Sequence, residues 1–268
     1  MRQRLRDARP RILAVAGRLW DRRPLGPGGY AKRHAKLVEQ ALGSEQLDRL
    51  IATGERLPEG YGVGFDERLV EFPWLYSRRP FGRLLDAGST LNHEQVLDRF
   101  QPEAESLCIA TLQPEQEAHT RRRISYVYAD LRGLPFRDGW FDTVICASTL
   151  EHVGMDNRGY GDDAAAASDP AAEQAAALAE LLRVTAPGGR LLITVPYGRA
   201  EDHGWFRQYD DAAVRALLEG RESAVTIYAY GAEGWQLASP EDARDASYRD
   251  NAPAARAVAC IELRSASS

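Results

Sequence analysis

The stretch from residue 83 to 92, R-L-L-D-A-G-S-T-L-N, constrains the fold of this 268-residue chain more than any other. A short apolar run ends in Asp86, and a glycine and small hydroxyl residues follow it. This pattern is typical of a buried parallel strand whose tip meets a ligand. Gly88 lets the backbone come close to that ligand because it has no Cβ atom. We therefore expect a strand over residues 82–87 with a ligand at its carboxyl end.

The residues after this turn have the pattern of a helix start. Asn92 is placed to cap the helix, and Gln95 stands three residues later, in the capping-box position. We expect the helix to cover residues 94–100. A strand, a tight turn and a helix start together indicate the first half of a nucleotide-binding βαβ unit.

Strand and helix patterns alternate through the rest of the chain, which favours a mainly parallel, doubly wound sheet. A long alanine-rich helix is expected to stop at the sequence P-G-G at 187–189. A long polar connection separates the last two strands. The predicted strands are 82–87, 106–112, 124–129, 141–147, 190–195, 224–230 and 257–263, and the predicted helices are 94–100, 171–185 and 210–219.

Residues 1–79 precede this pattern and are predicted to form a basic helical extension of a main domain at 80–268. Helical spacing runs over 2–20, with a break near Pro10, and over 31–53, whereas Pro73 is expected to stop any regular element in its segment. Residues 1–36 hold nine arginines and two lysines against two aspartates, although the whole chain has a net charge of −5.

Two interpretations of this basic arm stay open. In one, its helix packs on the main domain or on a second subunit of a homo-oligomer. In the other, residues 1–30 make peripheral contact with an anionic membrane. No aromatic-studded basic groove accompanies the arm, so we expect no nucleic-acid partner.

Composition points to a cytoplasmic globular protein. Hydrophobic residues make up 44% and charged residues 27% of the chain, and no apolar run is long enough to span a membrane. No secretory signal is visible at the N-terminus. Cys108, Cys146 and Cys260 lie in apolar runs and are predicted to be buried thiols in a reducing compartment. Their spacing does not suit zinc.

Three blocks of this sequence resemble the class I S-adenosylmethionine-dependent methyltransferases. The first is L-L-D-A-G at 84–88, the second is A-D-L-R-G-L-P-F-R-D-G-W-F-D-T-V-I-C-A-S-T-L-E-H-V at 129–153, and the third is A-L-A-E-L-L-R-V-T-A-P-G-G-R-L-L-I-T-V-P at 177–196. The match covers about residues 82–200, and H-G-W-F-R-Q-Y-D at 203–210 continues it more weakly. The resemblance implies a Rossmann-like, doubly wound, seven-stranded sheet, mainly parallel with an antiparallel last strand.

The resemblance also implies roles for residues at the strand tips. The turn after the first strand should hold the methionine part of S-adenosyl-L-methionine. Asp130 should accept a hydrogen bond from the adenine amine, with Leu131 beside the ring, and residues 147–149 should line the sulfonium. The implied cofactor-binding residues are Asp86, Ala87, Gly88, Ser89, Thr90, Thr111, Asp130, Leu131, Ala147, Ser148 and Thr149.

The chain departs from the family pattern in two places. The first turn has one glycine where a second and often a third are usual, so Ser89 and Thr90 take their places. The second strand usually ends in an acid that binds both ribose hydroxyls, and here Thr111 stands at that position. A neutral hydroxyl makes a weaker bond than a carboxylate. Gln113 or Glu115 is near enough in sequence to compensate.

The resemblance implies methyl transfer, for which a protein mainly supplies alignment and desolvation. A hydroxyl acceptor must also lose its proton, and His152 is the candidate general base because imidazole titrates near neutral pH. We expect a small-molecule or saccharide acceptor and a role in biosynthesis. Histidines in this block also serve for packing alone, which is the competing interpretation.

The acidic segment after His152 could form a lid over the acceptor or hold Mg²⁺. Its candidate metal ligands are His152, Asp156, Asn157, Asp162 and Asp163. Aromatic residues with polar tips suit a sugar or a ring-shaped acceptor, although such residues often only pack. The candidate acceptor-pocket residues are Tyr160, Tyr197, His203, Trp205, Arg207 and Tyr209.

A second hypothesis is a non-catalytic scaffold of the same fold, or a membrane-recruited partner in a biosynthetic pathway. The single-glycine turn, Thr111 and the basic arm motivate it. A dehydrogenase is disfavoured, because no G-x-G-x-x-G follows the first strand and no acid ends the second.

Overall fold

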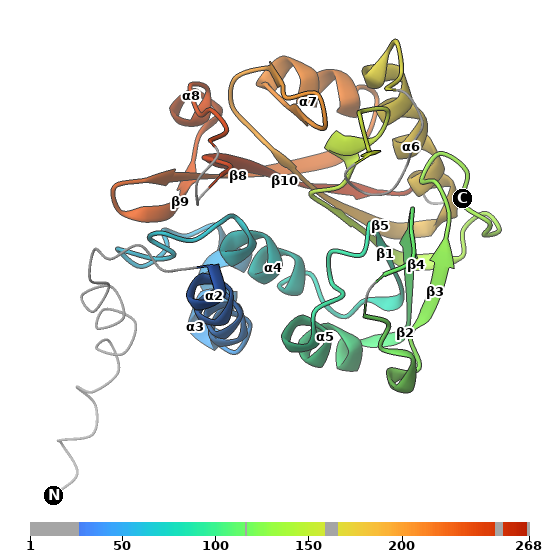
Figure 1. Ribbon diagram of the computed structural model, residues 1–268, viewed down its shortest axis with the longest axis horizontal. Coiled ribbons are helices and arrows are strands. Elements are labelled where there is room, and N and C mark those ends of the chain that lie inside the picture. The colour runs from blue at the N-terminus through green and yellow to red at the C-terminus, as the bar shows by residue number, and fades with distance from the viewer. Residues whose placement is uncertain (1–26, 116, 159–165, 250–253, 267–268) are drawn as a thin grey trace, which may run out of the picture.

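The computed structural model describes residues 27–115, 117–158, 166–249 and 254–266 (Figure 1). The helix predicted at 2–20 lies outside these residues, and so does most of the basic arm. Membrane contact through residues 1–30 therefore stays a prediction. Within the described residues, no helix is both long enough and apolar enough to cross a bilayer.

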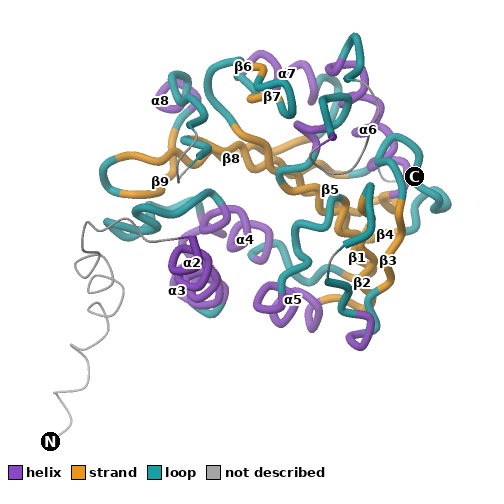
Figure 2. The backbone as a smooth tube through the Cα atoms, in the orientation of Figure 1, coloured by secondary structure: helices purple, strands orange, loops and turns teal. Residues whose placement is uncertain are grey.

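Eight of the described strands form one large sheet in the order β3-β2-β1-β4-β5-β10-β8-β9 (Figure 2). Strands β1 to β5 pair in parallel, whereas β10 runs antiparallel to both β5 and β8. The bounds are β1 Gly82–Ala87, β2 Ala104–Thr111, β3 Ser125–Tyr128, β4 Phe141–Ala147, β5 Thr185–Pro196, β8 Ser223–Gly231, β9 Gly234–Ala238 and β10 Ala257–Arg264. The predicted fold class is confirmed, including the antiparallel last strand.

The sheet has eight strands and not the predicted seven, because β9 forms inside the segment expected to be a polar connection. β9 pairs with β8 as a hairpin through Gly231 and Gly234. A backbone bridge from Tyr61 to Gly234 also ties it to the N-terminal part of the chain. A separate two-stranded ribbon consists of β6 (Glu201–Asp202) and β7 (Arg207–Gln208).

Helices cover both faces of the sheet, as Figure 1 shows. Successive side chains of β1 pack on opposite faces of the sheet, since Leu84 belongs to one buried cluster and Leu85 to the other. Helices α2 (Pro27–Leu42), α3 (Glu45–Thr53), α4 (Arg68–Tyr76) and α5 (Glu94–Phe100) pack in the first cluster. Helices α6 (Pro170–Val184), α7 (Asp211–Leu218) and α8 (Pro240–Ala243) pack in the second. The sheet is thus doubly wound, as predicted.

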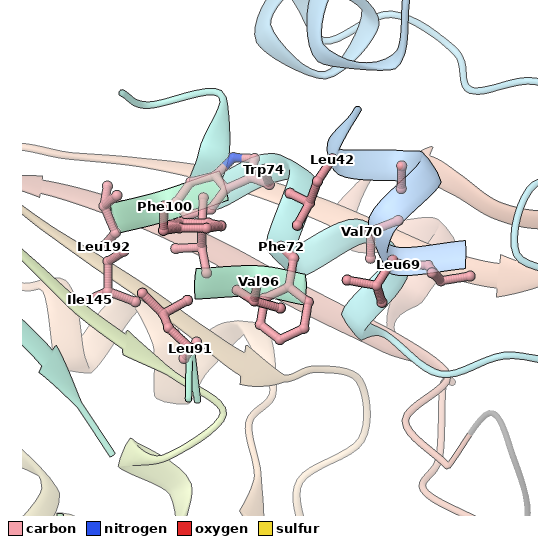
Figure 3. Close-up of a cluster of buried hydrophobic side chains, with 14 of the residues drawn as sticks. Leu42, Leu69, Val70, Phe72, Trp74, Leu91, Val96, Phe100, Ile145 and Leu192 are labelled. Carbon is pink, nitrogen blue, oxygen red and sulfur yellow. The ribbon is translucent and has the colours of Figure 1, made fainter. Parts of the chain in front are cut away.

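The N-terminal helices share a continuous core with the sheet. Figure 3 shows side chains of α2, α4 and α5 meeting residues of β4 and β5, among them Leu42, Phe72, Val96, Phe100, Ile145 and Leu192. The predicted helical segment 31–53 is two helices. The first ends at Leu42, and Ser44 caps the N-terminus of α3 by accepting a hydrogen bond from the Leu47 amide. The three cysteines are buried and unpaired, as predicted.

Helix α4 corrects the prediction that Pro73 stops any regular element, since Pro73 lies inside it. A proline cannot donate to the carbonyl four residues earlier, which here belongs to Leu69. The hydroxyl of Tyr61 donates to that carbonyl instead. The helix therefore continues through Pro73, because a side chain outside the helix supplies the missing donor.

The predicted cap of α5 is also wrong. The N-cap residue is His93, and its side chain makes no capping hydrogen bond. The amide of Asn92 is bonded elsewhere: its Nδ2 donates to the Glu117 carbonyl at 3.0 Å, and its Oδ1 accepts from the Tyr126 hydroxyl at 2.9 Å. Asn92 thus connects the turn after β1 to the chain between β2 and β3.

Candidate functional site

A cavity of about 520 Å³ opens at the carboxyl ends of β1, β2 and β4 and beside the residues that follow β3. Parallel strands place their carboxyl ends at one edge of a sheet, which explains why distant segments meet there. The lining contains these predicted site residues: Gly88, Thr111, Asp130, Leu131, Ser148, Thr149, His152 and Asn157. Gln113 and Glu115 also line it.

Other residues of the predicted set lie behind the cavity wall. Asp86 is fully buried, and its Oδ2 accepts from the Leu91 amide at 2.9 Å. Burial raises the pKa of Asp86 to about 7. The hydroxyl of Thr90 donates to the Ala147 carbonyl at 2.6 Å, which joins the turn after β1 to the tip of β4. Asp86, Ala87, Thr90 and Ala147 therefore form the support of the wall.

The turn after β1 carries backbone strain. Gly88 has a φ of +117° and Ser89 a φ of +63°. The left-handed region is costly for serine, which has a Cβ atom. The Ser89 hydroxyl is buried and has no hydrogen-bond partner within the described part of the chain. Gly88 packs directly against Thr149 at the tip of β4.

An acid stands on the wall near Thr111, although not at the position that the family pattern predicts. Thr111 is the last residue of β2, and Glu115 lines the cavity four residues later. The Glu115 carboxylate helps to raise the pKa of Asp86, after the larger effect of burial. Glu115 therefore offers a carboxylate to the same edge of the sheet.

Asp130 is held by a residue that sequence reasoning missed. Its two carboxylate oxygens accept from the Arg132 guanidinium at 2.5 to 3.1 Å. This bond from Arg132 lowers the pKa of Asp130. Arg132 also donates to Glu173 of α6 at 2.6 Å and itself lines the cavity. In the sequence, the D-x-R spacing of Asp130 and Arg132 after β3 is the pattern that could have indicated this pair. His93 and Asn92, read only as helix-start residues, also line the cavity.

His152 lies on the cavity wall in the short 3-10 turn η3 (Leu150–His152) that follows β4. Its Nδ1 is 2.8 Å from the carbonyl oxygen of Trp205, and a carbonyl can only accept. Nδ1 therefore carries a proton, and in the neutral ring Nε2 carries the lone pair. Burial lowers the pKa of His152, which favours that neutral form.

The predicted acceptor residues have other surroundings. Tyr197 and Tyr209 are buried, and the Tyr209 hydroxyl donates to Gln174 at 2.7 Å. His203 stacks on Phe206 with 4.5 Å between ring centroids. None of the five described candidates, Tyr197, His203, Trp205, Arg207 and Tyr209, lines the cavity. The Trp205 ring packs beside the cavity-lining His152, with 5.2 Å between ring centroids. Tyr160 lies outside the described residues.

The geometry does not support a magnesium site. Among the described residues, no three His, Cys, Asp or Glu side chains come together in a way that could hold a metal ion. Arg158 occupies both carboxylate oxygens of Asp156. Asp162 and Asp163 lie outside the described residues.

Comparison with known proteins bears on this site. Residues 99–193 match a family model described as a methyltransferase domain. This range contains most of the cavity wall, from the end of α5 to β5, and includes His152. No curated protein matches the sequence.

Solved structures with a similar chain path include the N-methyltransferase NodS from Bradyrhizobium japonicum WM9 in complex with S-adenosyl-l-homocysteine. It is 16% identical, and the alignment covers 87% of this chain and 98% of that chain with a TM-score of 0.48. A second is the 1,6-didemethyltoxoflavin-N1-methyltransferase of Burkholderia thailandensis, which is 15% identical with coverages of 91% and 92% and a TM-score of 0.48.

The family match contains the second sequence block and most of the third, and the strand order of the sheet agrees with all three blocks. The cavity lies at the edge of the sheet where the first two blocks end. The predicted resemblance to methyltransferases is confirmed over residues 99–193, which match the methyltransferase domain model.

Proposed function

We propose that the protein transfers the methyl group of S-adenosylmethionine to a hydroxyl of a small molecule or saccharide, with His152 as general base. The position of His152 carries this proposal. It lies on the cavity wall close in sequence to Ser148 and Thr149, and the Trp205 carbonyl keeps its proton on Nδ1. Nε2, which carries the lone pair, is then the atom that takes the proton from the acceptor hydroxyl.

The cavity fits the cofactor in size and chemistry. Its volume of about 520 Å³ lies in the range of small-molecule sites. Thr111 and Glu115 offer oxygens suited to ribose hydroxyls, and Asp130 with Leu131 suits adenine. Gly88 and the 147–149 turn would hold the methionine part and the sulfonium. The bound cofactor would supply an electrophilic methyl group, and the chain would align the acceptor and exclude water.

The three buried, unpaired thiols support the cytoplasmic placement that forms part of this proposal. The test begins with calorimetric titration of the protein with S-adenosylmethionine and S-adenosylhomocysteine, alongside Asp130→Ala. We expect micromolar binding that the variant weakens at least tenfold. Absence of binding to the unsubstituted protein would overturn the proposal and favour the non-catalytic scaffold.

The second step is labelled-methyl transfer to a panel of sugars, phenols and amines. We expect His152→Gln to bind the cofactor normally and to lose transfer to hydroxyl acceptors by roughly a hundredfold or more. His203→Gln is the matched control, because this histidine stacks on Phe206 away from the cavity wall. Equal activity of both variants would exclude His152 as the base.

A further inference from the structure

Helix α4 contains a buried carboxylate that the proposed mechanism does not use. The helix residues from 69 to 75 are all buried, and Glu71 is the one charged side chain among them, with 0% exposure. A helix that is apolar all round is a core helix, and a charge inside it is costly unless it is paired. Glu71 has two partners: the Arg68 guanidinium and the Ser148 hydroxyl, which donates to Oε1 at 2.8 Å.

Ser148 is the cavity-lining end of this contact. It directly follows β4 and adopts a φ of +42°, in the left-handed region. Such a conformation persists in a residue other than glycine only when its surroundings determine it. The Ser148 amide donates to the Thr194 carbonyl of β5 at 2.9 Å. The sheet thus holds the backbone of Ser148, and α4 holds its side chain.

The charges around Glu71 show why its carboxylate matters. The Arg68 guanidinium pairs with Glu71. The carboxyl groups of Glu67 and Glu151 interact electrostatically with both Glu71 and Arg68. Burial raises the pKa of Glu67 to about 8 and the pKa of Glu151 well above its usual value. Glu67 therefore favours the neutral form near neutral pH, and Glu71 is the carboxyl group that pairs with Arg68 and accepts from Ser148.

We propose that Glu71 is a positioning residue of the methyl-donor site. By accepting a hydrogen bond from the Ser148 hydroxyl, Glu71 holds the residue after β4 in its left-handed conformation. Helix α4, which belongs to the predicted extension 1–79, thus forms part of the site. A leucine could fill the same volume without burying a charge. It could not accept the bond from Ser148. This inference rests on the proposed function, which assigns the 147–149 turn to the sulfonium.

The test is a double-mutant cycle read by calorimetric affinity for S-adenosylhomocysteine. Glu71→Leu should weaken binding roughly tenfold, since a hydrogen bond to a charged acceptor is lost. Glu71→Gln should bind within about threefold of the unsubstituted protein, because its amide oxygen can still accept from Ser148. In the Ser148→Ala background, Glu71→Leu should have no further effect. Glu67→Gln is the matched control, since Glu67 adjoins the same helix and no hydrogen bond joins it to Ser148; its affinity should be unchanged.

Each outcome is decisive for one claim. If the unsubstituted protein does not bind S-adenosylhomocysteine, the proposed function fails. If it binds and Glu71→Leu binds equally well, or loses affinity equally in both backgrounds, the positioning role is overturned. A role in neutralising Arg68 alone predicts that Glu71→Gln and Glu71→Leu lose affinity together. Should Glu71→Leu not fold, Ser148→Ala breaks the same bond from the cavity side, and its unchanged affinity would overturn the proposal.

Discussion

A Cβ atom built on Gly88 would lie 2.1 Å from Oγ1 of Thr149 and 2.7 Å from its Cβ. The turn after β1 and the tip of β4 therefore touch without space for a side chain between them. This contact closes the cavity wall at the position that the resemblance assigns to the methionine part of the cofactor. The glycine is required by the protein's own packing, whatever ligand binds beside it.

Gly88→Ala should lower both stability and cofactor affinity. The φ of +117° is unfavourable for alanine, and the new Cβ would push Thr149 away from its position. We expect a loss of about 2 to 4 kcal/mol in the free energy of unfolding, measured in urea. Gly133→Ala is the control, because nothing lies within 4 Å of a Cβ built there. Equal stability of the two variants would contradict the close contact.

Tyr61→Phe should destabilise the protein because it leaves the Leu69 carbonyl in α4 without its donor. An unsatisfied buried carbonyl costs about 1 to 3 kcal/mol. Pro73→Ala restores a backbone N–H that can donate to the same carbonyl. Tyr61→Phe should therefore cost less in the Pro73→Ala background, as measured by urea unfolding of all four proteins. An equal cost in both backgrounds would show that Tyr61 stabilises the helix in some other way.

Asp86 should make the protein less stable as pH rises. Its folded-state pKa is about 7, above the usual 3.8, so between these values the folded state binds more protons than the unfolded state. The stability that this group contributes is present at pH 4 and declines up to pH 7. Asp86→Asn should unfold with a shallower pH dependence over this interval, measured in urea at pH 5 and pH 7.5. The same slope in both proteins would mean that Asp86 ionises normally.

His152 should give methyl transfer an acidic limb below pH 6.5, since burial lowers its pKa from that value. The base works in its neutral form, so activity should be constant from pH 7 upward and decline as pH falls through the lowered pKa. The measurement is kcat against pH with saturating cofactor and acceptor. A limb above pH 7, or one unchanged in His152→Gln, would assign the titration to another group.

The local sequence pattern was sufficient to predict the bounds of strands whose apolar residues require burial. The bounds of β1 and β4 agree with the prediction, because continuous apolar runs that end in a small residue have few other ways to be buried. Helix α6 ends one residue before the predicted limit, ahead of the P-G-G sequence. The convergence of Gly88, Asp130 and Ser148 on one cavity follows from strand direction alone.

Partners in other segments of the chain explain the differences. Pro73 lies within a helix because Tyr61 supplies a donor, and β9 forms because β8 and Tyr61 offer a pairing edge. Asn92 leaves the helix cap because Tyr126 and Glu117 bind its amide more than twenty residues away along the chain. The partners of Asn92 lie too far along the chain for a local sequence pattern to include them.

The sequence by itself determined the doubly wound sheet and the edge of the sheet at which the cavity lies, since hydrophobic periodicity and short motifs act over neighbouring residues. Only the tertiary structure decided which side chains face the cavity and which support it. Thr90 bonds to Ala147, Arg132 holds Asp130, and Glu71 of an N-terminal helix reaches Ser148. Hydrogen bonds between buried groups depend on distances of about 3 Å, and those distances are set by packing across the whole molecule.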